Sequence, residues 1–427
     1  MVFGIFFGFR CRSWVKTIAV VAPLLFIGCG DSLSQPSQEE VKGGELLVNF
    51  SGLAIKGSLI EKGLIDANQT VYGYKAYKIP YTTRDEEGAE VKVSGLFVIP
   101  TGLPEIVHTT LGLSMVSDDH GTIFANREAP SVIADNSGAP DGSPIITTAL
   151  GGFATLQPDY IGFGDSNSHY HPFVLKDSLA NATVDFIKQV KIFSKDNNIT
   201  LNNQLFLTGY SEGGYASMAT LKKIEDEQIS ELKVSMTAPM AGPYALKAMA
   251  DGVLSQPKLG VPSFMANVGY AYAKANGQEV SSIINEPYAS KLPTLFNGDL
   301  ERTEIDPQLS YDTTGATGLF TEAITSDYFK SDTNWFKVSL TENSVHAWTP
   351  TTPVRLVHCE GDDVIPYGIS QLTERTMKAM GATNVALVPV EKALGLNTKV
   401  GHADCGPLAY KVATGMFAEV RKQTIGY

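Results

Sequence analysis

The feature that most constrains this chain is a serine in a glycine-bracketed turn, Gly209-Tyr210-Ser211-Glu212-Gly213. An apolar run at 204–208 precedes it and predicts a strand, and a helix-compatible stretch at 212–223 follows. A sharp strand-to-helix turn strains its central residue and crowds the neighbouring chain, so side chains two residues either side of the serine would collide. We therefore expect Ser211 to project from a strand end as a nucleophile.

Composition narrows the class of protein. The 427 residues are 43% hydrophobic and 18% charged, which is typical of a globular chain long enough for one large core with insertions. The formal net charge is -12, the isoelectric point is near 5.1, and no stripe of Lys and Arg occurs. Since phosphate backbones are bound by clustered cations, a nucleic-acid partner is not expected.

The N-terminus predicts export. Positive charges precede a short apolar run at 17–28, which is typical of a signal peptide and too short to span a bilayer. Phe26-Ile27-Gly28-Cys29 resembles a bacterial lipobox, although Phe26 stands where leucine is usual. We predict a signal peptide over 1–28, acylation of Cys29, a tether over 29–47 and a lipid-anchored protein of the bacterial cell envelope. The alternative is an ordinary secretory signal with an incidental cysteine.

The rest of the chain alternates between strand and helix patterns. Strands are predicted at 91–99, 105–110, 153–157, 204–208, 234–238, 354–358 and 385–390, and helices at 177–193, 212–223, 370–380 and 408–422. Such alternation predicts an α/β fold with a mostly parallel sheet covered by helices on both faces. Between 244 and 345 the alternation lapses, so we assign 48–243 and 346–427 to the core and 244–345 to a helical cap.

Two later segments supply partners for the serine, whose hydroxyl needs a base and a third group to orient that base. Asp362 lies in a turn just after the strand at 354–358, and His402 follows the last strand and a loop. Parallel strands end at one edge of a sheet, so both side chains are expected near Ser211. Asp363 is the local rival for the acid.

The order Ser211, Asp362, His402 is that of α/β-hydrolases. The chain resembles their secretory lipases and esterases from about residue 70 to 425, interrupted by the insertion. Residues 155–166 resemble the strand and loop beside the site in these proteins, and 358–366 resembles their H-G-x-x-D-x-x-V-P segment. That register implies Asp362 as the acid. The departure is Cys359, where glycine is usual.

The oxyanion hole departs further from the pattern. Relatives commonly carry His-Gly-Thr after the third strand, and we read the corresponding segment here as Thr109-Thr110-Leu111-Gly112-Leu113-Ser114. Because the donors are backbone N–H groups, the chemistry tolerates the change. We expect one donor at Glu212 and one near Leu113.

Cysteine positions predict a disulfide. Without the signal peptide and with Cys29 lipidated, Cys359 and Cys405 are the remaining thiols. Cys359 lies three residues before Asp362 and Cys405 three after His402, so the cysteines are neighbours if those loops meet in an oxidising compartment. Two buried free thiols are the alternative.

The other polar residues and aromatics have plainer readings. His108 and His358 are expected in the core, and Asp159 is expected to hydrogen-bond its own loop rather than act as the acid. A cluster of possible metal ligands fits no metal-binding spacing, so no metal is predicted: Asp118, Asp119, His120, His169 and His171. Aromatic residues of the insertion are candidates for an acyl pocket or for plain core: Phe264, Tyr270, Tyr272 and Phe320.

The resemblance implies hydrolysis of a small-molecule or lipid ester through an acyl-enzyme, without metal or organic cofactor. One alternative is a serine peptidase of the prolyl-oligopeptidase type, although the short segment before the core leaves no room for a propeller domain. A non-catalytic binding lipoprotein with this fold is the other.

Overall fold

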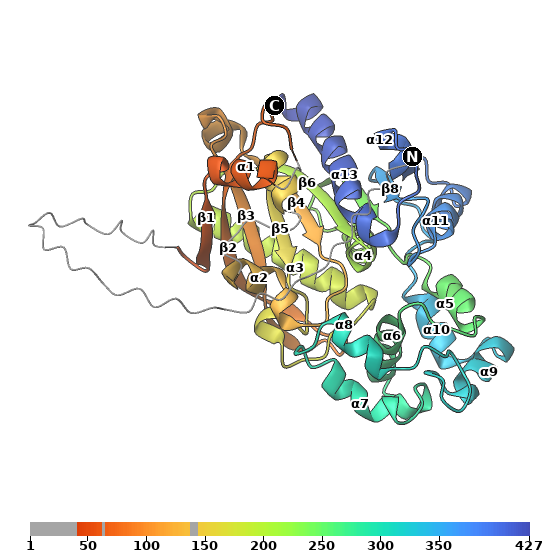
Figure 1. The fold of residues 1–427 in the computed structure, drawn as a ribbon. Helices are drawn as coiled ribbons and strands as arrows, with labels where there is room; N and C mark the ends of the chain where they lie inside the picture. The colour runs from red at the N-terminus through yellow and green to blue at the C-terminus, as the bar shows by residue number, and fades with distance from the viewer. Residues whose placement is uncertain (1–40, 62–64, 137–143) are drawn as a thin grey trace, which may run out of the picture. The chain divides into compact units, whose positions relative to one another are not determined.

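The computed structural model describes residues 41–61, 65–136 and 144–427, and within them nine strands form one sheet in the order β1-β2-β3-β5-β4-β6-β7-β8-β9 (Figure 1). The predicted signal peptide and Cys29 lie outside the described residues. β1 begins at Glu45, within the last residues of the predicted tether. None of the helices in the described part of the chain has the length and apolar character needed to cross a bilayer.

The bounds of the elements follow the alternation seen in the sequence. The strands are β1 (Glu45–Phe50), β2 (Gly73–Arg84), β3 (Glu90–Thr101), β4 (Leu113–Asp119), β5 (Ala154–Pro158), β6 (Leu201–Tyr210), β7 (Val234–Met240), β8 (Val354–His358) and β9 (Val385–Pro389). The helices around the sheet are α1 (Gly52–Glu61), α2 (Pro130–Asn136), α3 (Lys176–Asp196), α4 (Glu212–Asp226), α11 (Tyr367–Ala379), α12 (Val390–Leu394) and α13 (His402–Ile425). The helices between β7 and β8 are α5 (Leu246–Leu254), α6 (Pro262–Ala275), α7 (Tyr288–Leu295), α8 (Arg302–Ile305), α9 (Glu322–Lys330) and α10 (Trp335–Glu342).

The parallel part of the sheet carries the site. β5, β4, β6, β7, β8 and β9 run parallel to one another, whereas β1, β2 and β3 form an antiparallel extension in which β3 pairs with β5. Asp119 at the end of β4 pairs with Gly209 near the end of β6. The carboxyl ends of these strands therefore meet at one edge, as the sequence predicts.

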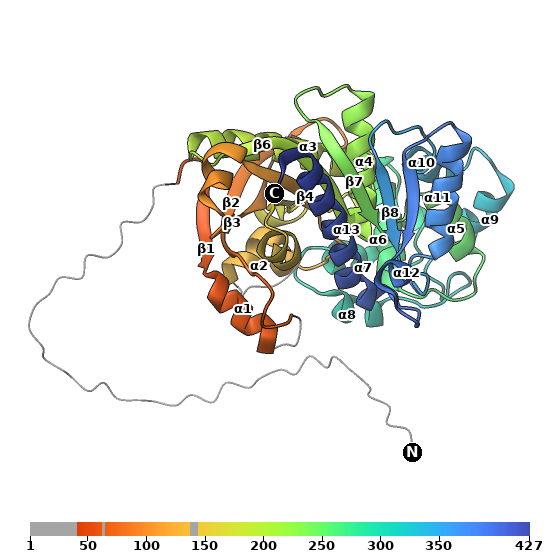
Figure 2. The same cartoon turned by 90° about the horizontal axis from the view of Figure 1, so that it is seen from above.

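Helices lie on both faces of the sheet (Figure 2), and alternate residues of the strands pack against different helical layers. On β6, Leu205 and Leu207 join the core beneath α3 and α4, whereas Phe206 faces the other layer and stacks on Phe417 of α13 at 4.7 Å. Both sets of side chains are almost completely buried. Burial on both faces explains why these strands read as continuous apolar runs.

The segment from α5 to α10 gathers below the sheet in Figure 1. Its helices are short, and its apolar side chains join the same core as those of α3 and α4. An insertion between β7 and β8 lies next to the carboxyl edge of the sheet because β7 ends there.

The prediction of a strand at 105–110 is wrong. The structure has a π-helical turn at Val107–Leu111, in which His108 is only half-buried, and the strand β4 follows it. Four of the seven residues of β4 are Ser or Asp, which hides its apolar character. Three of them have buried hydrogen-bond partners, as in the hydrogen bond from Thr183 Oγ1 to Asp119 Oδ1 at 2.8 Å.

Candidate active site

Ser211 occupies the strained turn between β6 and α4. Its backbone has φ 60° and ψ -118°, a conformation that L-residues rarely adopt. A Cβ on Gly209 would lie 2.4 Å from the carbonyl oxygen of Asp119, and a Cβ on Gly213 would lie 1.8 Å from the same oxygen. The predicted collision on both sides of the serine is confirmed, and it explains why both positions are glycine.

Hydrogen bonds join the three side chains that the sequence singled out. Nε2 of His402 lies 3.0 Å from Ser211 Oγ, and Nδ1 lies 2.6 Å from Asp362 Oδ2. A carboxylate only accepts, so Nδ1 of His402 donates, and in the neutral ring Nε2 is free to accept from the serine hydroxyl. The structure therefore brings together residues that lie 191 and 40 positions apart.

The carboxylate of Asp362 is held by four donors. Its Oδ1 accepts the N–H groups of Val364 at 2.9 Å and Ile365 at 2.8 Å, and its Oδ2 accepts from His358 Nε2 at 3.1 Å as well as from His402. Burial by itself raises the pKa of Asp362, but the hydrogen bonds from His358 and His402 and the charge of His402 lower it by more. The net pKa lies well below its ordinary value, so the acid stays ionised.

His358 is a fully buried histidine with both ring nitrogens bonded, as predicted. Nε2 faces two acceptors, Asp362 Oδ2 and the carbonyl oxygen of Ile365 at 3.1 Å, so this nitrogen carries the proton. Nδ1 lies 2.7 Å from Ser370 Oγ. The sequence reasoning missed that His358 holds the acid, although it stands four residues before Asp362 in the segment that resembles H-G-x-x-D.

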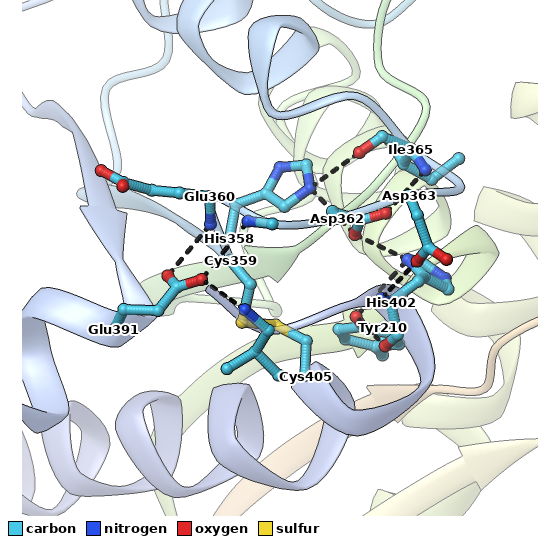
Figure 3. Close-up of a disulfide and its surroundings, with 12 residues drawn as sticks. Tyr210, His358, Cys359, Glu360, Asp362, Asp363, Ile365, Glu391, His402 and Cys405 are labelled. Atoms are coloured by element: carbon cyan, nitrogen blue, oxygen red, sulfur yellow. Dashed lines mark hydrogen bonds and ion pairs between the residues drawn. A yellow bond between two sulfur atoms is a disulfide. The ribbon is translucent and has the colours of Figure 1, made fainter. Parts of the chain in front are cut away.

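His402 is the first residue of α13 and not part of a loop. Both its backbone N–H and its carbonyl oxygen form hydrogen bonds with side chains (Figure 3). Its N–H donates to Asp363 Oδ1 at 2.9 Å, and its carbonyl oxygen accepts the hydroxyl of Tyr210 at 2.6 Å. Asp363 therefore contacts the main chain of the histidine, whereas Asp362 contacts its ring.

Two further links join the loop of Asp362 to the start of α13 (Figure 3). The predicted disulfide between Cys359 and Cys405 is confirmed, and both cysteines are fully buried. The carboxylate of Glu391 accepts the N–H groups of Glu360 at 3.0 Å, Gly361 at 3.3 Å and Val400 at 3.1 Å. The acid and the histidine thus sit on segments with several cross-links.

The placement of an oxyanion donor at Leu113 is wrong. Leu113 begins β4, its N–H donates to the carbonyl oxygen of Thr200 at 2.8 Å, and Ser211 lies at the opposite end of the neighbouring strand. His120-Gly121-Thr122 follows the carboxyl end of β4, so the His-Gly-Thr tripeptide is present further along the chain than the segment at 109–114. A Cβ on Gly121 would lie 3.8 Å from the Cβ of Ser211, and Thr122 lines the same cavity as Ser211.

The two buried histidines considered as metal ligands and the rejected acid have other partners. His171 Nε2 lies 2.8 Å from Glu212 Oε1, and His120 Nδ1 lies 2.7 Å from the carbonyl oxygen of Gly121. Asp159 accepts Oγ–H of Ser94 and of Ser131, each at 2.6 Å, so it joins its loop to β3 and α2. Across 41–61, 65–136 and 144–427, no three His, Cys, Asp or Glu side chains are grouped as for a metal ion.

An apolar cavity runs from Ser211 into the helices of the insertion. Its polar lining consists of Thr122, Ser211 and Glu212. The remaining lining is apolar and includes Met249, Val253, Phe264, Val268, Phe320 and Phe336. Of the aromatic residues singled out in the sequence, Phe264 and Phe320 therefore line the cavity. Tyr272 is fully buried and donates its hydroxyl to Val174 O at 3.1 Å, and Tyr270 lines a separate small cavity.

Comparison with known protein families finds a match for this chain. The model of the family described as secretory lipase matches residues 141–400, which is more than half of the chain. No curated protein matches the sequence.

Several solved structures share the fold. A putative hydrolase from Legionella pneumophila is 24% identical with a TM-score of 0.77, covering 89% of this chain and 98% of its own. The rice cell wall degrading esterase LipA from Xanthomonas oryzae is 22% identical with a TM-score of 0.74, covering 91% of this chain and 98% of its own. Candida antarctica lipase A is more distant, at 14% identity and a TM-score of 0.55, covering 86% and 78%. At these identities the likeness extends to the α/β-hydrolase fold.

Proposed function

Since the chain belongs to the secretory lipase family and is a carboxylic-ester hydrolase, we propose that it cleaves its substrate through an acyl-enzyme on Ser211. The observation that carries this proposal is the continuous hydrogen-bond chain from Ser211 Oγ through the ring of His402 to Asp362. The strained turn adds support, because it holds the hydroxyl at the edge of the sheet where the cavity begins.

The first half of the reaction acylates the serine. Nε2 of His402 takes the hydroxyl proton of Ser211 while Oγ forms a bond to the ester carbonyl carbon. Asp362 keeps the proton of His402 on Nδ1 and stabilises the imidazolium. Collapse of the tetrahedral intermediate breaks the bond to the alcohol oxygen, which takes the proton from Nε2. Water then repeats these steps and releases the acid.

The oxyanion needs donors on the side of the carbonyl away from His402. The N–H of Glu212 lies in the first turn of α4, where a helix offers no partner, and we assign it as one donor. The second donor is assigned to the His120-Gly121-Thr122 loop, at Thr122, because this residue lines the cavity beside Ser211.

The apolar cavity is the proposed site for the acyl chain. Its walls come mainly from α5, α6 and α10, so the insertion selects the substrate while the core performs the chemistry. Val268→Trp fills part of this space and should shift the preferred p-nitrophenyl ester to a shorter chain. An unchanged chain-length optimum would place the acyl group elsewhere.

Membership of a family of secreted enzymes indicates an exported protein. Lipid attachment at Cys29 is a further proposal, which rests on the lipobox-like sequence before it. Labelling of cells with radioactive palmitate tests it: the wild-type protein should be labelled and Cys29→Ser should not. Equal labelling of both would refute it.

The catalytic proposal is tested with Ser211→Ala. This change removes the hydroxyl, and the variant should lose hydrolysis of a short-chain p-nitrophenyl ester while its circular dichroism spectrum stays unchanged. Retained turnover by a folded Ser211→Ala protein would refute the assignment of the nucleophile.

A further inference from the structure

A buried pair of side chains lies directly behind the proposed nucleophile, and no step of the mechanism uses it. Glu212, the residue after Ser211, is 2% exposed, and its Oε1 lies 2.8 Å from Nε2 of His171, whose side chain is 7% exposed. The other oxygen, Oε2, is buried without a hydrogen-bond partner among the described residues. The carboxyl group of Glu212 therefore depends on His171.

The charge of the pair follows from its hydrogen bonds. Nδ1 of His171 lies 2.9 Å from the carbonyl oxygen of Ile161, which only accepts, so Nδ1 carries a proton. The hydrogen bond between Nε2 and Glu212 Oε1 needs one further proton. Whether that proton is on the nitrogen or on the oxygen, the pair has no net charge.

A carboxylate at this position matters because negative charge develops beside it during the reaction. Glu212 supplies a proposed oxyanion N–H and lines the cavity with Ser211. Without a counter-charge, its carboxylate would repel the oxyanion in a site of low dielectric. A unit charge on the order of 7 Å away, at an effective dielectric of about 20, slows a reaction about 50-fold.

We propose that His171 is a positioning residue that neutralises Glu212 and so keeps uncompensated negative charge away from the oxyanion. This role rests on the proposed function and extends it to a residue that does not touch the substrate. Burial by itself lowers the pKa of His171, but the charge of Glu212 and the hydrogen bond to it raise the pKa by more, so the net shift is upward. The direction agrees with a proton held between the two side chains.

Glu86 and His120 also affect the charge of His171. Glu86, in the turn between β2 and β3, adds negative charge that favours the protonated ring. His120, after β4, would oppose it if charged, but burial lowers the pKa of His120 and keeps that ring neutral. The aromatic rings of Tyr160, Phe163 and Phe173 also lie against the imidazole, which borders a small cavity.

The test is a double-mutant cycle on the mature protein, with kcat and KM measured on a short-chain p-nitrophenyl ester from pH 6 to 9. His171→Phe keeps an aromatic ring but removes the positive charge that balances Glu212. Glu212→Gln removes the negative charge itself. His171→Phe should lower kcat about 50-fold when residue 212 is glutamate and less than about fivefold in the Glu212→Gln background. KM should change little, because the ester ground state is neutral.

The pH profile separates electrostatics from packing. In His171→Phe, the pH profile of kcat should differ from that of the wild-type protein, and Glu212→Gln should remove the difference. An equal loss of kcat in both backgrounds, with no change in pH profile, would overturn the proposal. If His171→Phe does not fold, His171→Asn is measured against the same two backgrounds, since asparagine fits the space and can still donate to Ile161.

Titration with a fluorophosphonate distinguishes the two levels of failure. A wild-type protein that does not react at Ser211 counts against the catalytic mechanism itself. A wild-type protein that reacts, combined with no coupling between residues 171 and 212, counts against the role of His171 alone.

Discussion

Replacement of Asp362 by asparagine is expected to lower kcat about 10⁴-fold without unfolding the protein. The reason is the arrangement of donors around the carboxylate. Oδ1 accepts two backbone N–H groups, from Val364 and Ile365, so the amide oxygen of Asp362→Asn has to take that place. The amide NH₂ group then faces His402 Nδ1 and His358 Nε2, which are both donors in the wild-type protein.

The amide forces a change in the proton position of His402. To accept from the NH₂ group, Nδ1 of His402 must lose its proton, and the proton of the neutral ring moves to Nε2. A protonated Nε2 cannot take the hydroxyl proton of Ser211, so the loss appears in kcat. The amide NH₂ group also opposes the Nε2–H of His358, which should lower the free energy of unfolding by about 1–3 kcal/mol.

Asp363→Asn is the matched control, because it makes the same chemical change one residue away. Its amide oxygen can still accept the backbone N–H of His402, so kcat should fall less than about tenfold. The assay is kcat and KM on a short-chain p-nitrophenyl ester, with thermal unfolding to check the fold. Equal losses, or a larger loss for Asp363→Asn, would move the acid and refute the reasoning.

The disulfide and the hydrogen bonds of Glu391, which hold the loop that carries Asp362, lead to two further predictions. Replacing Cys359 and Cys405 with serine should lower the free energy of unfolding in urea by up to about 4 kcal/mol, the loop entropy for a separation of 46 residues, and an unchanged midpoint would contradict this. Burial by itself raises the pKa of Glu391, but hydrogen bonds from backbone N–H groups lower it by more. The carboxylate of Glu391 therefore contributes its full stabilisation above about pH 4.5, the ordinary pKa of glutamate. This contribution is lost as pH falls through the pKa of Glu391 in the folded protein, which is lower. The difference in Tm between wild type and Glu391→Gln should therefore be largest near pH 7 and shrink below about pH 4, and a difference that stays constant with pH would argue against the role of that carboxylate.

The parts of the site that follow from local pattern could be predicted from the sequence. In the turn around Ser211, a Cβ on either glycine would lie within 2.4 Å of a main-chain atom. The need for glycine at these two positions can be read from the pentapeptide itself. Asp362 follows β8, which is apolar because most of its residues are buried, and His402 follows β9, an edge strand whose partly buried residues are also mostly apolar. Cys359 and Cys405 were paired through their spacing to those two residues.

The oxyanion loop could not be found by the same reasoning, because β4 does not look like a strand. Asp118 and Asp119 are fully buried in it, and their partners come from distant parts of the chain, as in the bonds from Tyr410 and Thr183. A search for the tripeptide His120-Gly121-Thr122 would have found the loop. The contact of His171 joins residues 41 positions apart that meet only in the packed structure, whereas His358 stands four residues before Asp362.

The most direct test of the central claim is reaction of the mature protein with a fluorophosphonate, followed by mass spectrometry of its peptides. The account predicts one phosphonyl group per molecule, on the peptide that contains Ser211, and no labelling of Ser211→Ala or of the heat-unfolded protein. A stoichiometric adduct on another residue, or an active esterase whose Ser211 stays unmodified, would contradict it.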